Sequence, residues 1–329
     1  MWRLNSSAYV LVITGFVLAT NGCSPKPDVW KHAKPNQKKV LVSFAPLYCF
    51  AHAVAGDDAY VLSLLTTQGP HDYEGTPTDL FKINEADLYI YNGLTLDDVF
   101  TDKMLRNHKN RNLISMAVGD VMLKKHSDLI IKDKPIKHKH GDVWHEHGAQ
   151  DPHIWLGPTR AKAITEIIAA KLGDIDPANA AKYEKRAGEF AKKLDELKAY
   201  GDAAFKDKKS KNFLSMHDSL RYFGREFLGL ENVDSIQVLP GIDPDQVKIA
   251  NLIALCKEKN IRVIAMEPQY SGKVPELIRN AVKKHGIDLT IIEIDPLETA
   301  QAMSNGNPDP EFYYKKMREN IDTLAKALP

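Results

Sequence analysis

The sequence predicts an α/β protein with two parallel-sheet lobes joined by one long rigid helix. In residues 39–116, apolar strand-like runs alternate with helical segments, and the same alternation returns in residues 212–294. Strands that alternate with helices are typical of parallel sheets. Between the two halves, residues 178–205 carry charged and apolar residues at helical spacing and contain no proline. At about 1.5 Å per residue, this stretch predicts a connecting helix of roughly 40 Å.

Composition describes a soluble globular protein that is large enough for two domains. The chain has 329 residues, a formal net charge of +1 and 43% hydrophobic residues. This balanced charge argues against nucleic acid or an anionic membrane surface as a partner. Cys49 and Cys256 show no paired spacing, so we expect two buried small hydrophobic side chains and no disulfide framework.

Residues 1–23 have the features of a bacterial signal peptide. A positively charged start precedes an apolar run at 9–19, which is too short to span a bilayer comfortably. The Gly-Cys pair that ends at Cys23 resembles the lipobox, in which the cysteine becomes lipidated, although Thr20 stands where that motif prefers an aliphatic residue. We expect an exported protein, periplasmic or at the cell surface, that is anchored through a lipid on Cys23. Residues 24–38 are expected to form a tether between this anchor and the folded protein. The alternative is ordinary signal cleavage and a free soluble protein.

The first lobe is expected at residues 39–173. Its strands are short apolar runs, and the first three are followed by proline, glycine or asparagine. The expected strands are 39–45, 60–66, 87–91 and 112–116. Helices are expected at 49–54, 79–84, 97–107 and 160–172, with Thr76 or Thr78 as the cap of the second.

The connecting helix, expected within 174–206, leads into a second lobe at 207–329 with the same order of elements. Asp176 and Pro177 give an N-cap followed by proline at the first helical position. The expected strands are 212–216, 234–239, 261–266 and 289–294. The expected helices are 221–228, 243–259, 271–285 and 308–328.

Polar side chains follow several of these strands at the point where each strand ends. His71 comes after the second strand, and His217, Glu267 and Asp295 each follow directly after a strand of the second lobe. In parallel α/β sheets, ligands bind at the carboxyl ends of the strands. Each residue alone could instead be a helix cap or a surface side chain. Their equivalent positions suggest one site.

A histidine-rich segment lies at 137–148 and contains His138, His140, His145 and His147. Its Gly, Lys and Asp residues show no helical or strand period, so we expect a loop. Such a segment cannot form a packed core, but neutral imidazole suits zinc and its neighbours. The alternative is a solvated basic loop. His153 follows between Pro152 and an apolar run, so we expect this histidine to be a rigidly held metal ligand.

Six motifs, in order and context, resemble one family of transport proteins. They are found at 69–77, 87–93, 151–156, 216–218, 266–269 and 294–297. Together they are similar to the metal-binding substrate-binding proteins of bacterial ABC importers, the zinc and manganese group (family 9, cluster A-I). The resemblance covers nearly the whole mature chain. Gly75 and Gly157 stand where the family usually has proline and aspartate, and neither change removes a ligand.

The resemblance implies two α/β lobes with Zn(II), the transported ligand, in the cleft between them. His71 and His153 would come from the first lobe, and His217 and Asp295 from the second. Glu267 would orient a ligand imidazole and not bind the metal itself. The resemblance also implies a monomer whose partner is an importer permease with its ATPase.

Three imidazoles and one carboxylate form the closed four-coordinate site that zinc prefers, whereas manganese prefers more oxygen ligands. In the family, a carboxylate in place of His217 accompanies manganese. A zinc hydrolase would show a motif such as His-Glu-x-x-His on a helix, and the histidines of His145-Glu146-His147 are too closely spaced for that. We therefore expect no catalytic residues. The remaining alternatives are a manganese or iron protein of the same importer family and a metal-sequestering or adhesive surface lipoprotein.

Overall fold

The structure is a computed structural model that describes residues 28–71, 73–132, 150–231, 233–237 and 241–329, together with the backbone of 136–140 and 143–147. The predicted signal peptide and Cys23 lie outside the described residues. Among the residues described, no helix has the length and apolar character needed to cross a membrane. Part of the predicted tether is docked on the first lobe, because Trp30 is buried and its indole nitrogen donates to the carbonyl oxygen of Lys82 at 3.1 Å.

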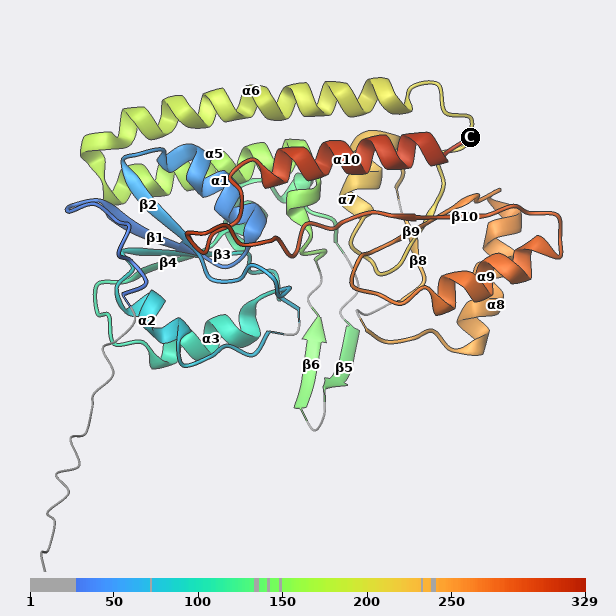
Figure 1. Ribbon diagram of the computed structural model, residues 1–329, viewed down its shortest axis with the longest axis horizontal. Helices are drawn as coiled ribbons and strands as arrows, with labels where there is room; N and C mark the ends of the chain where they lie inside the picture. Colours follow the sequence, from blue (N-terminus) through green and yellow to red (C-terminus); the bar gives the residue numbers. More distant parts are fainter. Residues whose placement is uncertain are drawn as a thin grey trace, which may run out of the picture.

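The first lobe contains a parallel four-stranded sheet in the order β2-β1-β3-β4 (Figure 1). Its strands are β1 (Lys38–Val42), β2 (Ala59–Ser63), β3 (Leu88–Tyr91) and β4 (Ile114–Ala117). Its helices are α1 (Ala45–Ala55), α2 (Asp79–Asn84), α3 (Asp98–Asn107), α4 (Val118–Lys125) and α5 (Pro158–Ile175). Val40 in β1 pairs with Val61 on one side and Leu88 on the other, and all three are buried, as an apolar central strand requires. Sequence reasoning identified these strands but missed α4.

The second lobe repeats this design with a parallel sheet in the order β10-β9-β7-β8. Its strands are β7 (Leu214–Ser215), β8 (Asp234–Ser235), β9 (Val263–Met266) and β10 (Thr290–Glu293). Its helices are α7 (Arg221–Phe223), which continues as a π-helical turn at Gly224–Leu228, α8 (Gln246–Glu258) and α9 (Lys273–Lys283). β7 and β8 are shorter than predicted, because only two residues of each pair with the other.

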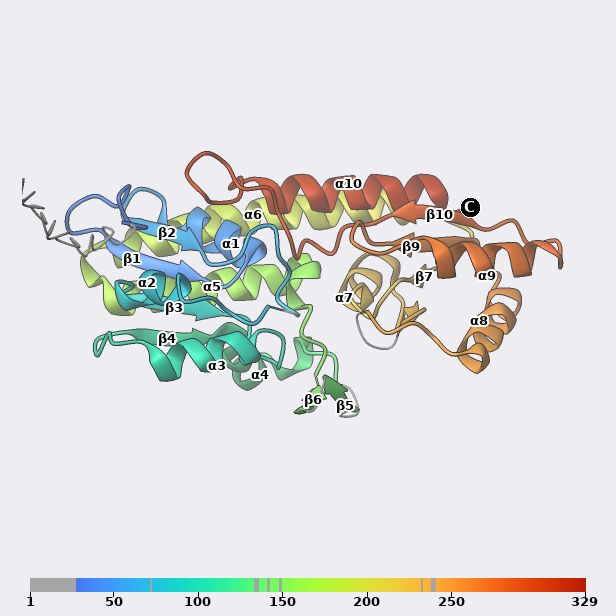
Figure 2. The same cartoon turned by 60° about the horizontal axis from the view of Figure 1, so that its bottom comes forward.

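Two long helices run side by side across both lobes, as Figures 1 and 2 show. α6 (Ala180–Phe205) is the predicted connecting helix, and α10 (Phe312–Ala327) lies against it. Arg186 fastens α6 to the first lobe by donating to the carbonyl oxygens of Val54 and Ala55 at 2.7 and 2.9 Å. At the other end, a Cβ on Gly201 would lie 2.3 Å from the ring of Phe227. Glycine thus lets the second lobe pack directly on the helix backbone.

The chain crosses from the second lobe back to the first before α10 begins. We call residues 295–311 the crossing segment. Its backbone joins the end of β2, because Ala300 donates from its amide to the carbonyl oxygen of Thr66 at 2.8 Å. The side chain of Asn307 accepts from the amide of Ser63 at 2.9 Å. The crossing segment therefore connects the edge of the first sheet to β10.

The histidine-rich segment is not the predicted loop. Its backbone forms an antiparallel hairpin of β5 (Ile136–His140) and β6 (Val143–His147), which lies at the junction of the lobes on the side opposite α6 and α10 (Figures 1 and 2). The register pairs His138 with His145. Two five-residue runs separated by Gly-Asp have a sequence typical of a two-residue hairpin, and this signal was missed. Metal binding by this hairpin stays a prediction.

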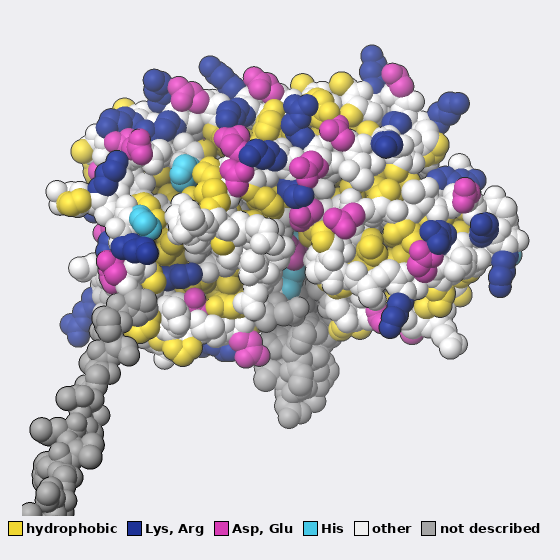
Figure 3. Space-filling model, in the orientation of Figure 1, with side chains coloured by type: hydrophobic (Ala, Val, Ile, Leu, Met, Phe, Trp, Pro, Cys, Tyr) yellow, Lys and Arg dark blue, Asp and Glu magenta, His cyan; other side chains and the backbone are white. Residues whose placement is uncertain are grey.

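Buried apolar side chains fill both lobes. The larger core continues under α6 and α10, and a smaller one surrounds the sheet of the second lobe. Cys49 and Cys256 are both buried and unpaired by disulfides, which confirms the sequence-based expectation. On the face seen in Figure 3, lysine and arginine side chains are interspersed with aspartate and glutamate, in keeping with a net charge of +1.

Candidate metal site

Three histidines and one glutamate converge where the two lobes meet. His71 and His153 come from the first lobe, His217 follows β7 in the second lobe, and Glu298 lies on the crossing segment. One nitrogen or oxygen atom of each residue lies within 4.8 Å of the other three. His153, His217 and Glu298 are buried, and the His71 side chain is 13% exposed. The structure thus brings together the three predicted histidines and adds a carboxylate.

Five of the six distances among these atoms are close to the edges of a tetrahedron, and the sixth, between His71 and His217, is within 4.8 Å. The Nε2 atom of His153 lies 3.3 Å from Nε2 of His71 and 3.4 Å from Nε2 of His217. Oε1 of Glu298 lies 3.2, 3.7 and 3.7 Å from the Nε2 atoms of His71, His153 and His217. A tetrahedral zinc site with bonds of about 2.0–2.1 Å has ligand-to-ligand distances of about 3.3–3.4 Å. Five of the spacings are therefore within about 0.4 Å of those expected for four-coordinate zinc.

His71 lies on the loop after β2 and is the most exposed member of the group. Beyond it, the loop is held by Asp79, whose carboxylate accepts from the amide of Thr76 at 2.7 Å and from the hydroxyl of Tyr73. A pocket of about 410 Å³ opens beside His71 and Glu298. Both lobes line it, through Thr67, Gln68 and Tyr73 on one side and Gln269 and Tyr270 on the other. A metal ion can approach the group from this pocket.

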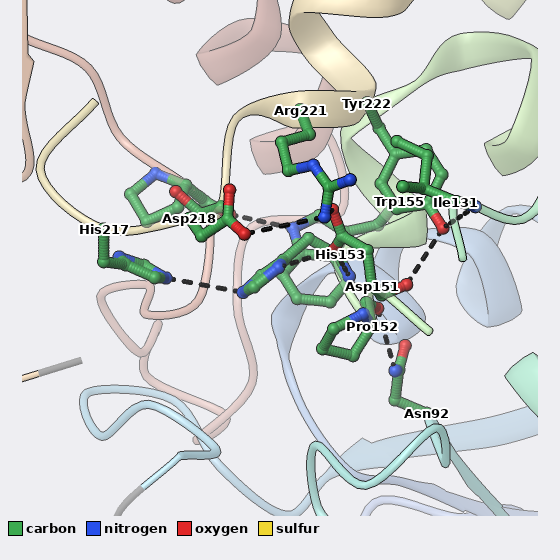
Figure 4. A network of polar contacts seen from close by, with 12 residues as sticks. Asn92, Ile131, Asp151, Pro152, His153, Trp155, His217, Asp218, Arg221 and Tyr222 are labelled. Carbon is green, nitrogen blue, oxygen red and sulfur yellow. Dashed lines mark hydrogen bonds and ion pairs between the residues drawn. The ribbon is translucent and has the colours of Figure 1, made fainter. Parts of the chain in front are cut away.

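His153 is held by its own neighbours in the sequence. Oδ1 of Asp151 accepts from the His153 amide at 3.0 Å and lies 2.9 Å from ring Nδ1. When Nδ1 donates this bond, Nε2 keeps the lone pair that faces the other ligands. Asn92 supports the turn by donating to the carbonyl oxygen of Pro152 at 3.0 Å (Figure 4). The orientation expected from the rigid sequence context is therefore produced by hydrogen bonds.

His217 is oriented by a buried carboxylate. Glu267, directly after β9, forms an ion pair with ring Nδ1 of His217 and leaves Nε2 facing the group. The side-chain Nε2 of Gln269 donates to the other oxygen of Glu267 at 2.8 Å. Glu267 lies outside the group of four ligand atoms, in the position of an orienting residue.

The carboxylate in the group is not the predicted one. Asp295 lies outside it, and its side chain instead accepts from the Leu297 amide at 2.7 Å. Asn320 on α10 holds the backbone nitrogen and oxygen of Asp295 at 3.0 and 2.6 Å. Leu297 adopts a positive φ of 64°, so the chain turns sharply before Glu298. Sequence reasoning noticed the strand end but had no signal for this turn, which brings the next carboxylate to the histidines.

Electrostatics divide the group into charged and neutral members. Burial and the neighbouring His217 and His71 lower the pKa of His153 well below its usual 6.5. Burial opposes charge on His217 too, but the carboxylate of Glu267 outweighs it and raises the pKa to about 9. Burial alone would raise the pKa of Glu298, yet the three histidines lower it to about 2. Before metal binds at neutral pH, His153 is neutral, His217 is protonated and Glu298 is ionised.

This distribution predicts that metal binding displaces a proton. Because imidazole binds metal only when neutral, zinc must remove the proton of His217, and affinity should rise about tenfold per pH unit from pH 7 to pH 9. Below pH 7 the proton on His217 must still be displaced, so affinity should continue to fall by about tenfold per pH unit toward pH 5. Calorimetry at pH 7.5, in buffers of different ionisation enthalpy, should count about one proton released per zinc.

A matched variant separates this proton from other sources. Glu267→Gln removes the charge that raises the His217 pKa, so proton release at pH 7.5 should fall toward zero. An affinity that stays flat from pH 5 to pH 9 would contradict the three-histidine site.

Comparisons with known proteins agree with this geometry. Residues 40–327 match the family described as zinc-uptake complex component A, periplasmic. The chain belongs to this family. The family is one of transport proteins that bind a substrate and is not a class of enzyme. The family's description places its members in the periplasm, as components of zinc uptake.

Two relatives and one solved structure illustrate the similarity. The chain is 30% identical to the zinc-binding protein AdcA of Streptococcus pyogenes serotype M1 over 294 residues, which is 87% of this chain but 55% of AdcA, so it spans about half that relative's length. It is 29% identical to the high-affinity zinc uptake system protein ZnuA of Bacillus subtilis, over 100% of this chain and 99% of ZnuA. The fold is shared with the laminin-binding protein Lmb of Streptococcus agalactiae, at a TM-score of 0.70 and 24% identity, over 89% and 100% of the two chains.

Proposed function

We propose that this chain binds one Zn(II) ion between its lobes, outside the cytoplasm, and delivers it to the permease of an ABC importer. The convergence of three imidazole nitrogens and one carboxylate oxygen, most of them 3.2–3.7 Å apart, supports this most strongly. Three imidazoles and a carboxylate form a closed site without an open position for water, which suits a carried ion better than a catalytic one. Family membership and the zinc-binding names of the relatives point to the same cargo.

The proposed ligands are His71, His153, His217 and Glu298, with Glu267 orienting His217. Glu298 replaces Asp295 in this assignment, because it is the carboxylate that lies near the three Nε2 atoms. Manganese is the alternative cargo. It prefers oxygen-rich coordination, and this group offers one carboxylate against three imidazoles.

The proposed setting is a monomer anchored to the membrane by a lipid on Cys23. The Gly-Cys pair after an apolar run supports the anchor. We also propose that the hairpin histidines, His138, His140, His145 and His147, gather zinc weakly when the ion is scarce. The hairpin lies at the junction of the lobes, the same junction at which the four ligands meet.

Metal preference tests the proposed cargo. Zn(II) should outcompete Mn(II) by more than about a hundredfold in calorimetric competition, in line with the Irving–Williams order and the imidazole-rich ligand set. His217→Glu should reduce the difference in affinity between Zn(II) and Mn(II), because it exchanges a nitrogen ligand for an oxygen ligand. His285→Glu, at an exposed position in the second lobe, is the control and should leave this difference unchanged. Equal affinity of the wild-type chain for the two ions would refute the zinc assignment.

A further inference from the structure

A polar network joins the two lobes directly beside the candidate site (Figure 4). Arg221 and Tyr222 lie on α7, which closely follows His217 in the second lobe. Their side chains reach across to Asp151 and Ile131 of the first lobe. These contacts involve none of the four ligand atoms.

Arg221 pairs with a buried carboxylate of the opposite lobe. Its Nη1 atom lies 3.7 Å from Oδ2 of Asp151 and 3.5 Å from Oδ2 of Asp218. The side chains of Arg221 and Asp151 are 10% and 2% exposed. A buried charge is costly unless a partner compensates it, so this pairing favours the docked arrangement of the two lobes.

Tyr222 holds the backbone of the same first-lobe segment. Its buried hydroxyl accepts from the amide of Ile131 at 3.0 Å and donates to the carbonyl oxygen of Asp151 at 2.9 Å. Burial raises the pKa of Tyr222, so the hydroxyl keeps the proton that it donates. Both contacts fix the position of Asp151 from the second lobe.

Asp151 in turn contacts His153, one of the proposed ligands. While Oδ2 faces Arg221, Oδ1 accepts from the amide of His153 and contacts its ring Nδ1. The orientation of the His153 ring therefore depends on Asp151, and the position of Asp151 depends on side chains of the other lobe. Such outer contacts are known to orient metal-binding imidazoles and to tune their basicity.

We propose that Arg221 and Tyr222 are positioning residues that set the His153 imidazole from the opposite lobe, so that this ligand is ready for metal only while the lobes are docked. The inference rests on the proposed function, because it treats His153 as a zinc ligand. It makes docking of the lobes and assembly of the site one event, since His217 and the two positioning residues belong to the same short segment.

A second ion pair across the same boundary provides a matched control. Arg160 on α5 lies 2.7 Å from Glu226, which follows α7, and also donates to the carbonyl oxygen of Leu129 at 2.8 Å. The side chains of this pair are 7% and 4% exposed. Among the described interactions, Glu226 itself contacts neither a proposed ligand nor Asp151, whereas Arg160 lies over the ring of Tyr222, 4.8 Å from its centroid. Glu226→Gln removes the charge of this pair but leaves Arg160 packed on Tyr222, so it should weaken lobe docking and preserve the orientation of His153.

The experiment measures zinc affinity with a chromophoric chelator and coordination geometry from the visible spectrum of bound Co(II). Arg221→Met and Tyr222→Phe should each weaken zinc binding by about ten- to a hundredfold and change the Co(II) bands. Arg221→Lys should recover part of the affinity, because it keeps the charge but loses the planar fork. Glu226→Gln should lower the melting temperature yet keep affinity within about threefold and the Co(II) bands unchanged. In a chain that already carries Asp151→Asn, Arg221→Met should weaken zinc binding by less than about a further threefold, because the two residues act through one another.

The outcomes are distinct. Wild-type affinity and Co(II) bands in Arg221→Met and Tyr222→Phe would overturn the inference while leaving the proposed function intact. Equal losses in Glu226→Gln and Arg221→Met would also overturn it, because docking alone would explain both. A wild-type chain that binds neither Zn(II) nor Co(II) would refute the proposed function itself. Circular dichroism checks folding, and if Arg221→Met does not fold, Tyr222→Phe and Arg221→Lys decide between the same outcomes.

Discussion

His153→Ala is expected to abolish the tight zinc equivalent. His153 is buried, and its Nε2 atom lies 3.3 and 3.4 Å from the Nε2 atoms of His71 and His217. Its loss therefore removes one of the four proposed ligand atoms. Ligand at a hundredfold excess over its dissociation constant stabilises a fold by about 2.7 kcal/mol, which raises the melting temperature of a chain of this size by several degrees. Scanning calorimetry with zinc should show that shift in the wild type and lose most of it in His153→Ala. His285→Ala, at an exposed position, should keep it.

Deletion of residues 137–148, which contain the histidines of the hairpin, should have the opposite effect to His153→Ala. The deletion should remove weak extra zinc and leave one tight equivalent with its thermal shift intact. The reason is preorganisation: the cleft ligands are held by hydrogen bonds before metal arrives, and ligands that are already ordered lose less entropy on binding. If the deletion abolishes the tight equivalent, the hairpin supplies a primary ligand and the assignment of four residues is wrong.

Glu298→Gln should weaken zinc binding by more than about a hundredfold, because loss of a charged direct ligand exceeds the ten- to hundredfold effect of an outer contact. Asp295→Asn makes the same chemical change three positions earlier in the crossing segment. It should cost less than about tenfold, since asparagine retains an oxygen that can accept from the Leu297 amide. Zinc titration of the two variants side by side distinguishes the carboxylates. The reverse order of effects would restore Asp295 as the ligand predicted from sequence.

Local patterns made most of the fold predictable. The buried runs of β1 and β9 and the long periodic stretch of α6 are properties of short segments, and each was identified within a few residues. His71 and His217 were also predictable, because both follow strands and the topology of parallel sheets puts strand ends together. His153 was predictable from its position between Pro152 and an apolar run. These features could be predicted because they depend on local sequence and on simple sheet topology.

The fourth member of the candidate site, Glu298, depends on contacts that no local pattern encodes. The crossing segment is placed by Trp155, whose indole nitrogen donates to the carbonyl oxygen of Pro296 at 2.8 Å, and by Asn320 on α10. These contacts and the positive φ of Leu297 decide that Glu298, and not Asp295, faces the histidines. Two carboxylates so close in sequence cannot be told apart without that tertiary framework. The hairpin was missed for another reason, since its polar composition concealed a short strand-turn-strand pattern.

The most direct test of the central claim is a crystal structure of the one-to-one zinc complex, with anomalous scattering recorded at the zinc edge. We predict one strong peak between the lobes, about 2.0–2.2 Å from the Nε2 atoms of the three histidines and a carboxylate oxygen of Glu298. The four converging side chains already present in the protein should move little around it. A strong peak on the hairpin or beside Asp295, with none among His71, His153 and His217, would contradict the account.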